Sequence, residues 1–222
     1  MKNFNSVLAF GDSHVAGCEL ANKYNLDDYL SGRITIEQAD ESGKKLAFPQ
    51  IVADTLKIPC YNYAMSGGSN SRSLRLLIQA VQEHPNSLVL FGYTSTDRSE
   101  LYYPLGGLGC DADNFLQLGM QWEGVFKNPI NDFYIKNLNP YNNLKDLMFC
   151  VDNICTGYST DYIHLPLFPE EVPNVDNIFT FENHKNYLDW CNARGFKKLQ
   201  HFHYGKDAHS ALADLIVKDL TS

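Results

Sequence analysis

Apolar positions in the first part of the chain fall into two alternating patterns. The short unbroken runs are residues 6–10, 60–65 and 87–91. Such runs are typical of strands buried in a parallel sheet. Between them, residues 48–56 and the stretch from Ser69 or Asn70 to Pro85 carry apolar residues at helical spacing. Alternating strands and helices require right-handed crossovers, so the pattern predicts a three-layer α/β/α fold with a flavodoxin-like parallel sheet.

Two stretches interrupt this pattern. Residues 22–45 are polar and rich in Asp, Gly and Lys, which indicates a surface excursion. Residues 99–141 are rich in Gly, Asn and aromatic residues and follow neither period. A structureless loop of that length is uncommon in a compact domain, so the second stretch is predicted to be a partly ordered insertion with a functional role.

After the insertion, the alternation of elements resumes. The elements expected here are a helix over residues 144–155, a fourth strand over 162–168, and helices over 183–192 and about 206–220. Pro166 weakens the prediction of the strand, because proline cannot donate to a sheet ladder. The sequence therefore predicts one domain over residues 1–222, with a sheet of about five strands and an insertion at about 99–141.

Composition narrows the classes of function. The 222 residues are 44% hydrophobic and 20% charged, which is ordinary for a globular protein. A formal net charge of −8 and a pI near 5.3 disfavour phosphate backbones and anionic lipid headgroups, so neither nucleic-acid nor membrane partners are predicted. With no apolar stretch of membrane-spanning length and no signal peptide, a cytoplasmic location is expected, or the virion or host cytoplasm if a phage encodes the chain. No pattern indicates a metal or cofactor, and the oligomeric state is left open.

The ends of the predicted strands are the places to look for chemistry. In a parallel α/β sheet, ligands bind in the crevice at the carboxyl ends of the strands. Three loops at these ends are rich in small and hydrogen-bonding residues. They are residues 11–14 (Gly-Asp-Ser-His), 66–70 (Ser-Gly-Gly-Ser-Asn) and 92–98 (Gly-Tyr-Thr-Ser-Thr-Asp-Arg).

In these loops the sequence resembles the SGNH/GDSL hydrolase superfamily. The first block of that family is a Gly-Asp-Ser turn after strand one, matched by residues 11–13, and the second is a glycine after strand two, matched by Gly67. The third is normally Gly-x-Asn-Asp, where residues 92–95 read Gly-Tyr-Thr-Ser, and the Thr-Ser-x-Asp-Arg run that ends at Arg98 is similar to a phage and bacterial branch. The last block is a histidine just before the terminal helix.

The resemblance implies a role for each match. Ser13 is implied to be the nucleophile, activated by a histidine base. Its backbone N–H, at a helix N-terminus, and that of Gly67 are implied to form an oxyanion hole. Thr94 aligns with the asparagine that supplies the family's third donor, although a rotatable hydroxyl is a poorer donor than that amide.

Two histidines near the C-terminus fit the role of the base. The family pattern has a catalytic histidine followed six residues later by a structural one, which matches His203 and His209. His209 also shares the inward face of the last predicted helix. The alternative pairs Asp207 with His209 as acid and base, which keeps a carboxylate but places the base inside that helix. His203 is favoured.

The orienting acid is missing from its usual place. If His203 is the base, the position of the family's aspartate holds Gln200 or His201, neither of which is a carboxylate. The partner of His203 is then a backbone carbonyl or a carboxylate from elsewhere in the chain. In the family, Asp12 usually has a structural role. The residues expected to contact substrate or to support the site are Asp12, His14, Asn70, Asp97, Arg98 and His209.

These implications give a predicted function and one alternative. The prediction is a metal-free and cofactor-free serine esterase that cleaves a small ester through an acyl-enzyme. An O-acetyl group on a carbohydrate is the preferred substrate, followed by a lipid or thioester acyl group. The alternative is a non-catalytic binding or structural module with the hydrolase fold, for example in a phage particle. Thr94 at the donor position and the absent acid favour that alternative.

Overall fold

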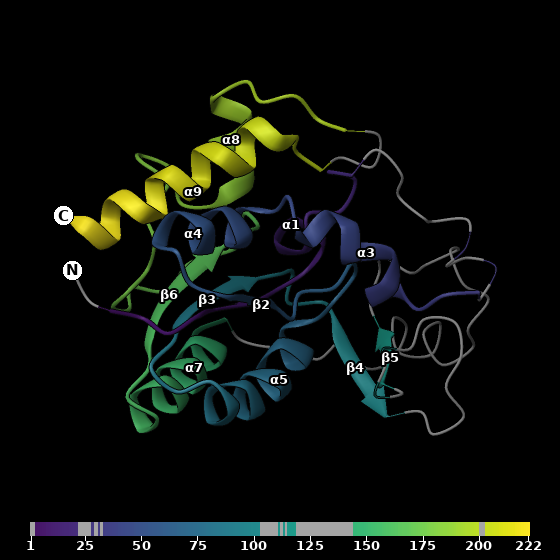
Figure 1. Cartoon of the computed structure of the whole chain (residues 1–222), viewed down its shortest axis with the longest axis horizontal. Coiled ribbons are helices and arrows are strands. Elements are labelled where there is room, and N and C mark those ends of the chain that lie inside the picture. Colours follow the sequence, from purple (N-terminus) through teal and green to yellow (C-terminus); the bar gives the residue numbers. More distant parts are fainter. Residues whose placement is uncertain are drawn as a thin grey trace.

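Four of the described segments form a parallel sheet. The computed structural model describes residues 3–21, 28, 31, 33–102, 111, 113, 115–118, 144–199 and 203–222. The strands are β1 (Val7–Phe10), β2 (Cys60–Asn62), β3 (Leu88–Tyr93) and β6 (Asp161–Pro166). Their order is β2-β1-β3-β6 and all pairs are parallel, which is the flavodoxin-like order (Figure 1). The predicted α/β class and parallel sheet are confirmed, with four strands in the described part of the chain where the sequence predicts about five.

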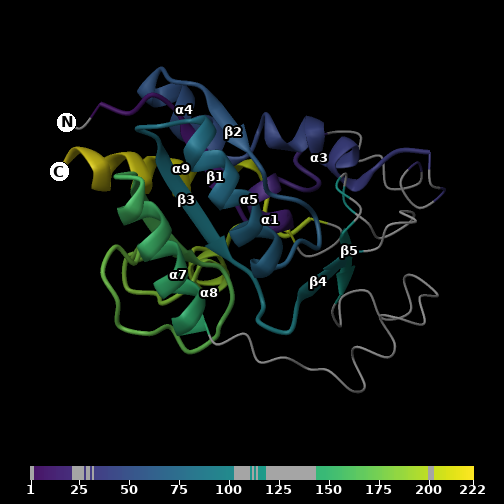
Figure 2. The same ribbon diagram turned by 90° about the horizontal axis from the view of Figure 1, so that it is seen from below.

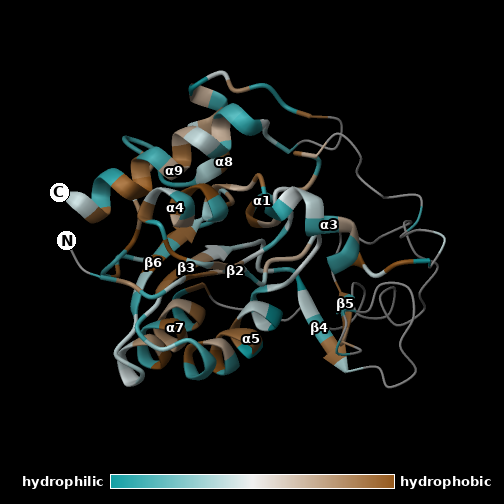
Figure 3. Ribbon diagram, in the orientation of Figure 1, coloured by the Kyte–Doolittle hydropathy of each residue, from teal (hydrophilic) through white to brown (hydrophobic). Residues whose placement is uncertain are grey.

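Helices cover both faces of this sheet. One face carries α4 (Phe48–Leu56), α8 (Tyr187–Ala193) and α9 (Lys206–Thr221), and the other carries α5 (Asn70–Glu83) and α7 (Leu144–Gly157) (Figure 1). Apolar and polar residues are mixed along α5, α7 and α9, as expected for helices with one buried side (Figure 3). None of the helices in the described ranges combines the length and apolar composition needed to cross a membrane.

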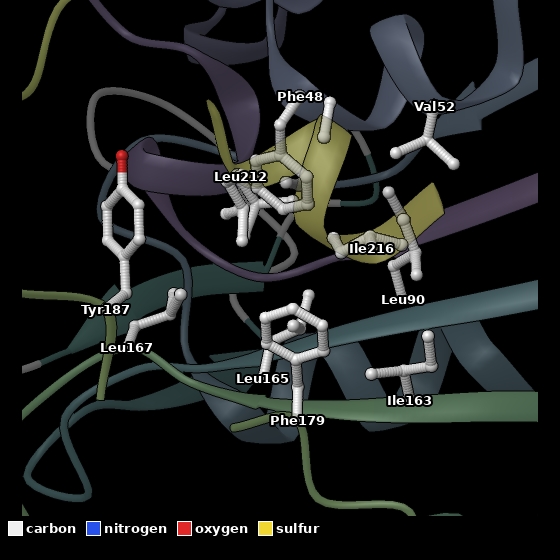
Figure 4. Close-up of a cluster of buried hydrophobic side chains, with 14 of the residues drawn as sticks. Phe48, Val52, Leu90, Ile163, Leu165, Leu167, Phe179, Tyr187, Leu212 and Ile216 are labelled. Carbon is white, nitrogen blue, oxygen red and sulfur yellow. The ribbon is translucent and has the colours of Figure 1, made fainter. Parts of the chain in front are cut away.

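The strands supply side chains to two cores. Successive residues point to opposite faces of a strand, so Val7 and Ala9 pack in one cluster while Leu8 and Phe10 pack in the other. In the first cluster, side chains of β3 and β6 meet those of α4 and α9 (Figure 4). Its labelled members include Phe48, Val52, Leu90, Ile163, Leu165, Leu212 and Ile216.

The stretch predicted as a surface excursion contains a helix. Within residues 22–45, α3 spans Ile36–Lys44 and is capped by Thr35, whose hydroxyl accepts from the Gln38 amide while the Gln38 side chain accepts from the Thr35 amide. This capping box starts a helix whose sequence is mostly polar, and the scarcity of apolar residues explains why the hydrophobic pattern missed it. The surface excursion that the sequence predicts over residues 22–45 thus contains a helix over residues 36–44.

The described part of the insertion includes a small antiparallel pair, β4 (Ser99–Tyr102) and β5 (Phe115–Leu118). It lies outside the main sheet and next to α5 (Figures 1 and 2). Arg75 of α5 forms ion pairs with Glu100, Asp111 and Asp113, and its guanidinium lies 4.0 Å from the centroid of the Phe115 ring. The rest of the predicted insertion, and most of its aromatic residues, lie outside the described residues.

The C-terminal elements differ from the predicted ones only at their ends. Pro166 is the last residue of strand β6, where its missing N–H does not interrupt the hydrogen-bond ladder. Helix α8 starts at Tyr187 rather than residue 183, because Asn186 caps it by accepting from the Asp189 amide. Helix α9 runs over Lys206–Thr221, close to the predicted range.

Candidate active site

The strand order reverses between β1 and β3, so the loops after these strands border the crevice where this fold binds ligands. The first of these loops leads into the short helix α1 (Ser13–Ala16). Gly11 has a φ of +146°, and a Cβ on it would lie 2.5 Å from Cγ2 of Val15. Only glycine therefore allows this sharp turn from β1 into α1. Ser13 is the first residue of α1, so its backbone N–H has no partner within the helix.

Asp12 is fully buried at the N-terminus of α1 and joins several parts of the site. It accepts hydrogen bonds from the His14 amide at 3.0 Å, from the Thr94 hydroxyl at 2.9 Å and from Nη1 of Arg98 at 2.9 Å. Burial raises the pKa of Asp12, but the interactions with His14 and Arg98 and these hydrogen bonds outweigh burial, so the pKa lies below its ordinary value. Asp12 is thus an ionised anchor for the loops after β1 and β3.

Thr94 is held by its neighbours on every side. Its hydroxyl donates to Asp12, its amide donates to Oδ1 of Asn70 at 2.9 Å, and its carbonyl accepts from Nδ2 of Asn70 at 2.9 Å. A hydroxyl has one proton to donate, and Thr94 donates it to the Asp12 carboxylate. In this arrangement the Thr94 hydroxyl is directed to Asp12, so the role of third oxyanion donor that the sequence predicts for it has no support from this contact. Asn70 is also fully buried, so it fixes the backbone of Thr94 and does not reach a substrate.

The loop after β2 lies against the loop after β1. Met65 donates its amide to the Gly11 carbonyl at 3.2 Å, and Gly68 closes the turn by donating to the Met65 carbonyl at 2.9 Å. Gly67 has a φ of +71°, a left-handed conformation that favours glycine. The turn therefore brings Gly67 to the same edge of the sheet as Ser13.

Asp40 of α3 fixes this turn from outside. Its carboxylate accepts from both the amide and the hydroxyl of Ser66, each at 2.6 Å. Burial raises the pKa of Asp40 to about 6, against the lowering effect of the two bonds from Ser66. The helix that the sequence pattern missed is thus a support for the loop that carries Gly67.

His203 lies beside α1. Its ring centroid is 5.1 Å from that of His14, the residue after the predicted nucleophile, and the two rings meet edge to face. Nδ1 of His203 is 2.8 Å from Oε2 of Glu19. Among the described residues, the Ser13 hydroxyl forms no hydrogen bond with the His203 ring. In hydrolases such hydrogen bonds often tighten only when substrate binds. The structure thus places His203 next to the helix of Ser13 and gives it a carboxylate partner.

Glu19 is the site residue that sequence reasoning missed. The prediction left open a carboxylate from elsewhere in the chain, and Glu19 and His203 are 184 positions apart. Neither the periodicity nor the family pattern marks an acid at this position, so no signal in the sequence could have found it.

His209 is buried within α9, and its Nδ1 accepts from the Phe48 amide at 3.1 Å. Burial lowers the pKa of His209 to about 3, and His14 and His203 add to this effect. With its lone pair used at Nδ1, the neutral ring carries its proton on Nε2 and cannot accept one there. Asp207, its partner in the alternative interpretation, is exposed. These contacts favour a structural role for His209.

A pH dependence of stability follows from His209. The unfolded chain binds a proton at this residue below its ordinary pKa of 6.5, whereas the folded protein does so only near pH 3. The contribution of His209 to the free energy of unfolding is therefore expected to be fully retained above about pH 6.5. It should be lost progressively, by about a few kcal/mol in total, as the pH drops towards 3. Urea unfolding across this range measures the slope. His209→Gln keeps an acceptor for Phe48 but cannot titrate, so its slope must be shallower; equal slopes would contradict this assignment.

His14 is a buried neighbour of the predicted base. Its ring meets those of Phe168, Tyr187 and His203 edge to face. Burial lowers the pKa of His14 to about 4, with Asp12 opposing the shift and His203 and Arg98 adding to it. His14 is therefore neutral near pH 7 and forms part of the wall behind His203.

The two remaining predicted residues belong to the loop after β3. Arg98 is 12% exposed, pairs with Asp12 and lies over the ring of Phe168 at 5.3 Å. Asp97 accepts a hydrogen bond from the Ser95 hydroxyl within its own turn. Arg98 is thus joined to the nucleophile loop through Asp12, while the described contact of Asp97 is local.

No family model and no curated protein matches this chain. Among solved structures, it is similar to the psychrotrophic esterase EstA from Pseudoalteromonas sp., with 12% identity, a TM-score of 0.48, and coverage of 98% of this chain and 97% of that one. It is also similar to a protein assigned to a lipolytic G-D-S-L family from Desulfitobacterium hafniense, with 11% identity, a TM-score of 0.43, and coverage of 96% of this chain and 98% of that one. A third similar structure is a family 2 carbohydrate esterase with a carbohydrate-binding domain, from Corynascus thermopiles (Myceliophthora fergusii). Its identity is 11% and its TM-score 0.49, with coverage of 97% of this chain and 65% of that one. With TM-scores below 0.5 at these identities, the assignment of function depends on the residues of this chain.

Proposed function

We propose that this protein is a serine esterase of the SGNH/GDSL type, with Ser13 as nucleophile and His203 as general base. The observation that carries the proposal is the position of the His203 ring. It lies against α1, 5.1 Å from the ring of His14, the residue after Ser13, and its Nδ1 is held by a carboxylate. An alcohol and an oriented imidazole at the carboxyl edge of a parallel sheet are the groups that acyl transfer requires.

The proposed reaction proceeds in two halves. His203 takes the hydroxyl proton of Ser13 as Oγ bonds to the ester carbonyl carbon, and the N–H groups of Ser13 and Gly67 stabilise the oxyanion. The tetrahedral intermediate breaks its bond to the alkoxy oxygen, which takes the proton from His203, and an acyl-enzyme remains. Water then attacks the acyl group with His203 again as base, which releases the acid and restores Ser13.

The substrate class rests on narrower support. The resemblance of the strand-end loops to SGNH hydrolases and the aromatic residues of the insertion favour an O-acetyl group on a carbohydrate, with lipid or thioester acyl groups next. The net charge of −8 favours a neutral substrate over a polyanion.

Labelling with a fluorophosphonate tests the nucleophile. The probe is expected to modify the wild-type protein, because it reacts with serines activated by a base, and to leave Ser13→Ala unmodified. Ser210→Ala is the matched control, since Ser210 is exposed on α9. Labelling that persists in Ser13→Ala would refute the assignment.

A non-catalytic module is the second candidate, and the hydroxyl of Thr94 favours it. Because that hydroxyl donates to Asp12, the proposed oxyanion hole has two backbone donors and no side-chain donor. Loss of one donor can lower the rate by about 10² to 10³. A wild-type protein that is not labelled and hydrolyses p-nitrophenyl acetate no faster than Ser13→Ala would establish this candidate instead.

A further inference from the structure

We infer that Glu19 is the positioning residue for His203, in place of the aspartate that the family carries shortly before its histidine. The inference rests on the proposed esterase function and assigns a role that the sequence pattern does not. It starts from one contact: Oε2 of Glu19 lies 2.8 Å from Nδ1 of His203, and the two side chains are only 9% and 13% exposed. A carboxylate so shielded from water interacts with the ring far more strongly than an exposed one.

The contact decides which nitrogen of His203 can act. A carboxylate only accepts hydrogen bonds, so Nδ1 must carry the proton that is donated to Glu19. The neutral ring then has its lone pair on Nε2, where it can accept the proton of Ser13. When the ring becomes a cation during the reaction, the same carboxylate stabilises it. Glu19 therefore acts through His203 and does not touch the substrate.

The backbone after α1 sets the position of Glu19 relative to Ser13. Helix α1 ends at Ala16 with Gly17 as its C-cap. The Cys18 amide donates to the Ser13 carbonyl at 3.0 Å, and the Leu20 amide donates to the Gly17 carbonyl at 3.1 Å. Glu19 has a φ of +68°, a conformation that is uncommon outside glycine, asparagine and aspartate. The nucleophile and the carboxylate thus belong to one tight turn, and His203 is brought to both from the far end of the chain.

The usual place of the acid is occupied by other residues. Gln200 and His201 stand there, and neither side chain is a carboxylate. Asp207 is exposed on α9, and Asp12 is fully buried, with Thr94 and Arg98 bonded to its carboxylate. Among these carboxylates and Glu19, it is Glu19 that contacts Nδ1 of His203.

Kinetics of three variants test this role. Glu19→Gln is expected to lower kcat for p-nitrophenyl acetate by about 10² to 10⁴ with little change in KM, because the amide no longer selects the tautomer. Glu19→Asp keeps a carboxylate and is expected to recover part of that loss. Glu41→Gln, a change at an exposed glutamate of α3, is the control and should match the wild type. A purely structural role for Glu19 would not give this separation of kcat from KM or the rescue by aspartate.

A second readout does not depend on activity. The ¹⁵N resonances of His203 in wild-type protein are expected to show the proton on Nδ1, and Glu19→Gln is expected to shift it partly or fully to Nε2. If Ser13 is required for turnover but Glu19→Gln matches Glu41→Gln, the role of Glu19 is refuted and the esterase remains. If the wild type shows no turnover that depends on Ser13, the esterase is refuted, and the resonances still decide whether Glu19 orients the ring. Should Glu19→Gln fail to fold, wild-type resonances with the proton on Nε2 would overturn the inference.

Discussion

Replacement of His203 by alanine is expected to lower kcat for ester hydrolysis by about 10⁴ to 10⁶, while the protein remains folded. The large factor follows because Ser13 and the base act as a unit, so removing either one removes the shared pathway. His203 belongs to neither hydrophobic core cluster, so its loss removes no side chain from the core. Turnover of p-nitrophenyl acetate, with circular dichroism as the check on folding, measures the effect.

His209→Ala is the matched variant and should behave in the opposite way. It leaves the Phe48 amide without its acceptor and creates a cavity beside α4, so we expect a loss of about 2 to 4 kcal/mol in the free energy of unfolding. The fraction that stays folded should keep most of its activity. The roles assigned to the two histidines would be wrong if folded His209→Ala were inactive and His203→Ala were active.

The second large effect concerns stability and arises at Arg98. Removal of this side chain by Arg98→Ala leaves the carboxylate of Asp12, which is fully buried, without its guanidinium partner. His14 cannot replace the lost charge near pH 7, because burial lowers its pKa to about 4. Breaking a buried pair in this way typically costs about 3 to 5 kcal/mol, which urea unfolding at neutral pH would measure.

A double-mutant cycle separates the pair from the packing around it. Asp12→Asn keeps an oxygen to cap α1 but removes the charge, so Arg98→Ala should cost much less in that background. The cost of the single variant should also shrink as the pH falls, since protonation of Asp12 relieves the unpaired charge. A loss below about 1 kcal/mol for Arg98→Ala at neutral pH would instead indicate a solvated pair of the surface kind.

Most of the sheet could be predicted because buried parallel strands appear as apolar runs. The apolar runs at residues 6–10 and 87–91 predict β1 and β3 to within about two residues of their ends. The helical spacing of apolar residues predicts the helices that have one apolar face. Helix α3 was missed because its sequence is mostly polar and because tertiary contacts such as that of Asp40 with Ser66 support it, although Thr35 and Gln38 fit the capping-box spacing. The β4–β5 pair depends on ion pairs with Arg75, which join residues distant in sequence.

The candidate site, too, could be predicted only in part from the sequence. Ser13 and Gly67 follow strands whose carboxyl ends must share one edge, so their approach could be expected from the topology. The hydroxyl of Thr94 donates to Asp12 because a buried carboxylate needs hydrogen-bond donors. The burial of Asp12 becomes visible only in the folded chain, so the sequence did not indicate this contact. Glu19 reaches His203 through the backbone conformation after α1, which no periodicity encodes.

The covalent intermediate offers the most direct test of an esterase that acts through Ser13. Wild-type protein mixed with p-nitrophenyl acetate, quenched rapidly and digested should yield an acetylated peptide that contains Ser13, and His203→Ala should yield far less of it in the same time. Turnover that continues in Ser13→Ala, or an acetyl group that forms at a different residue at the rate of turnover, would contradict the mechanism.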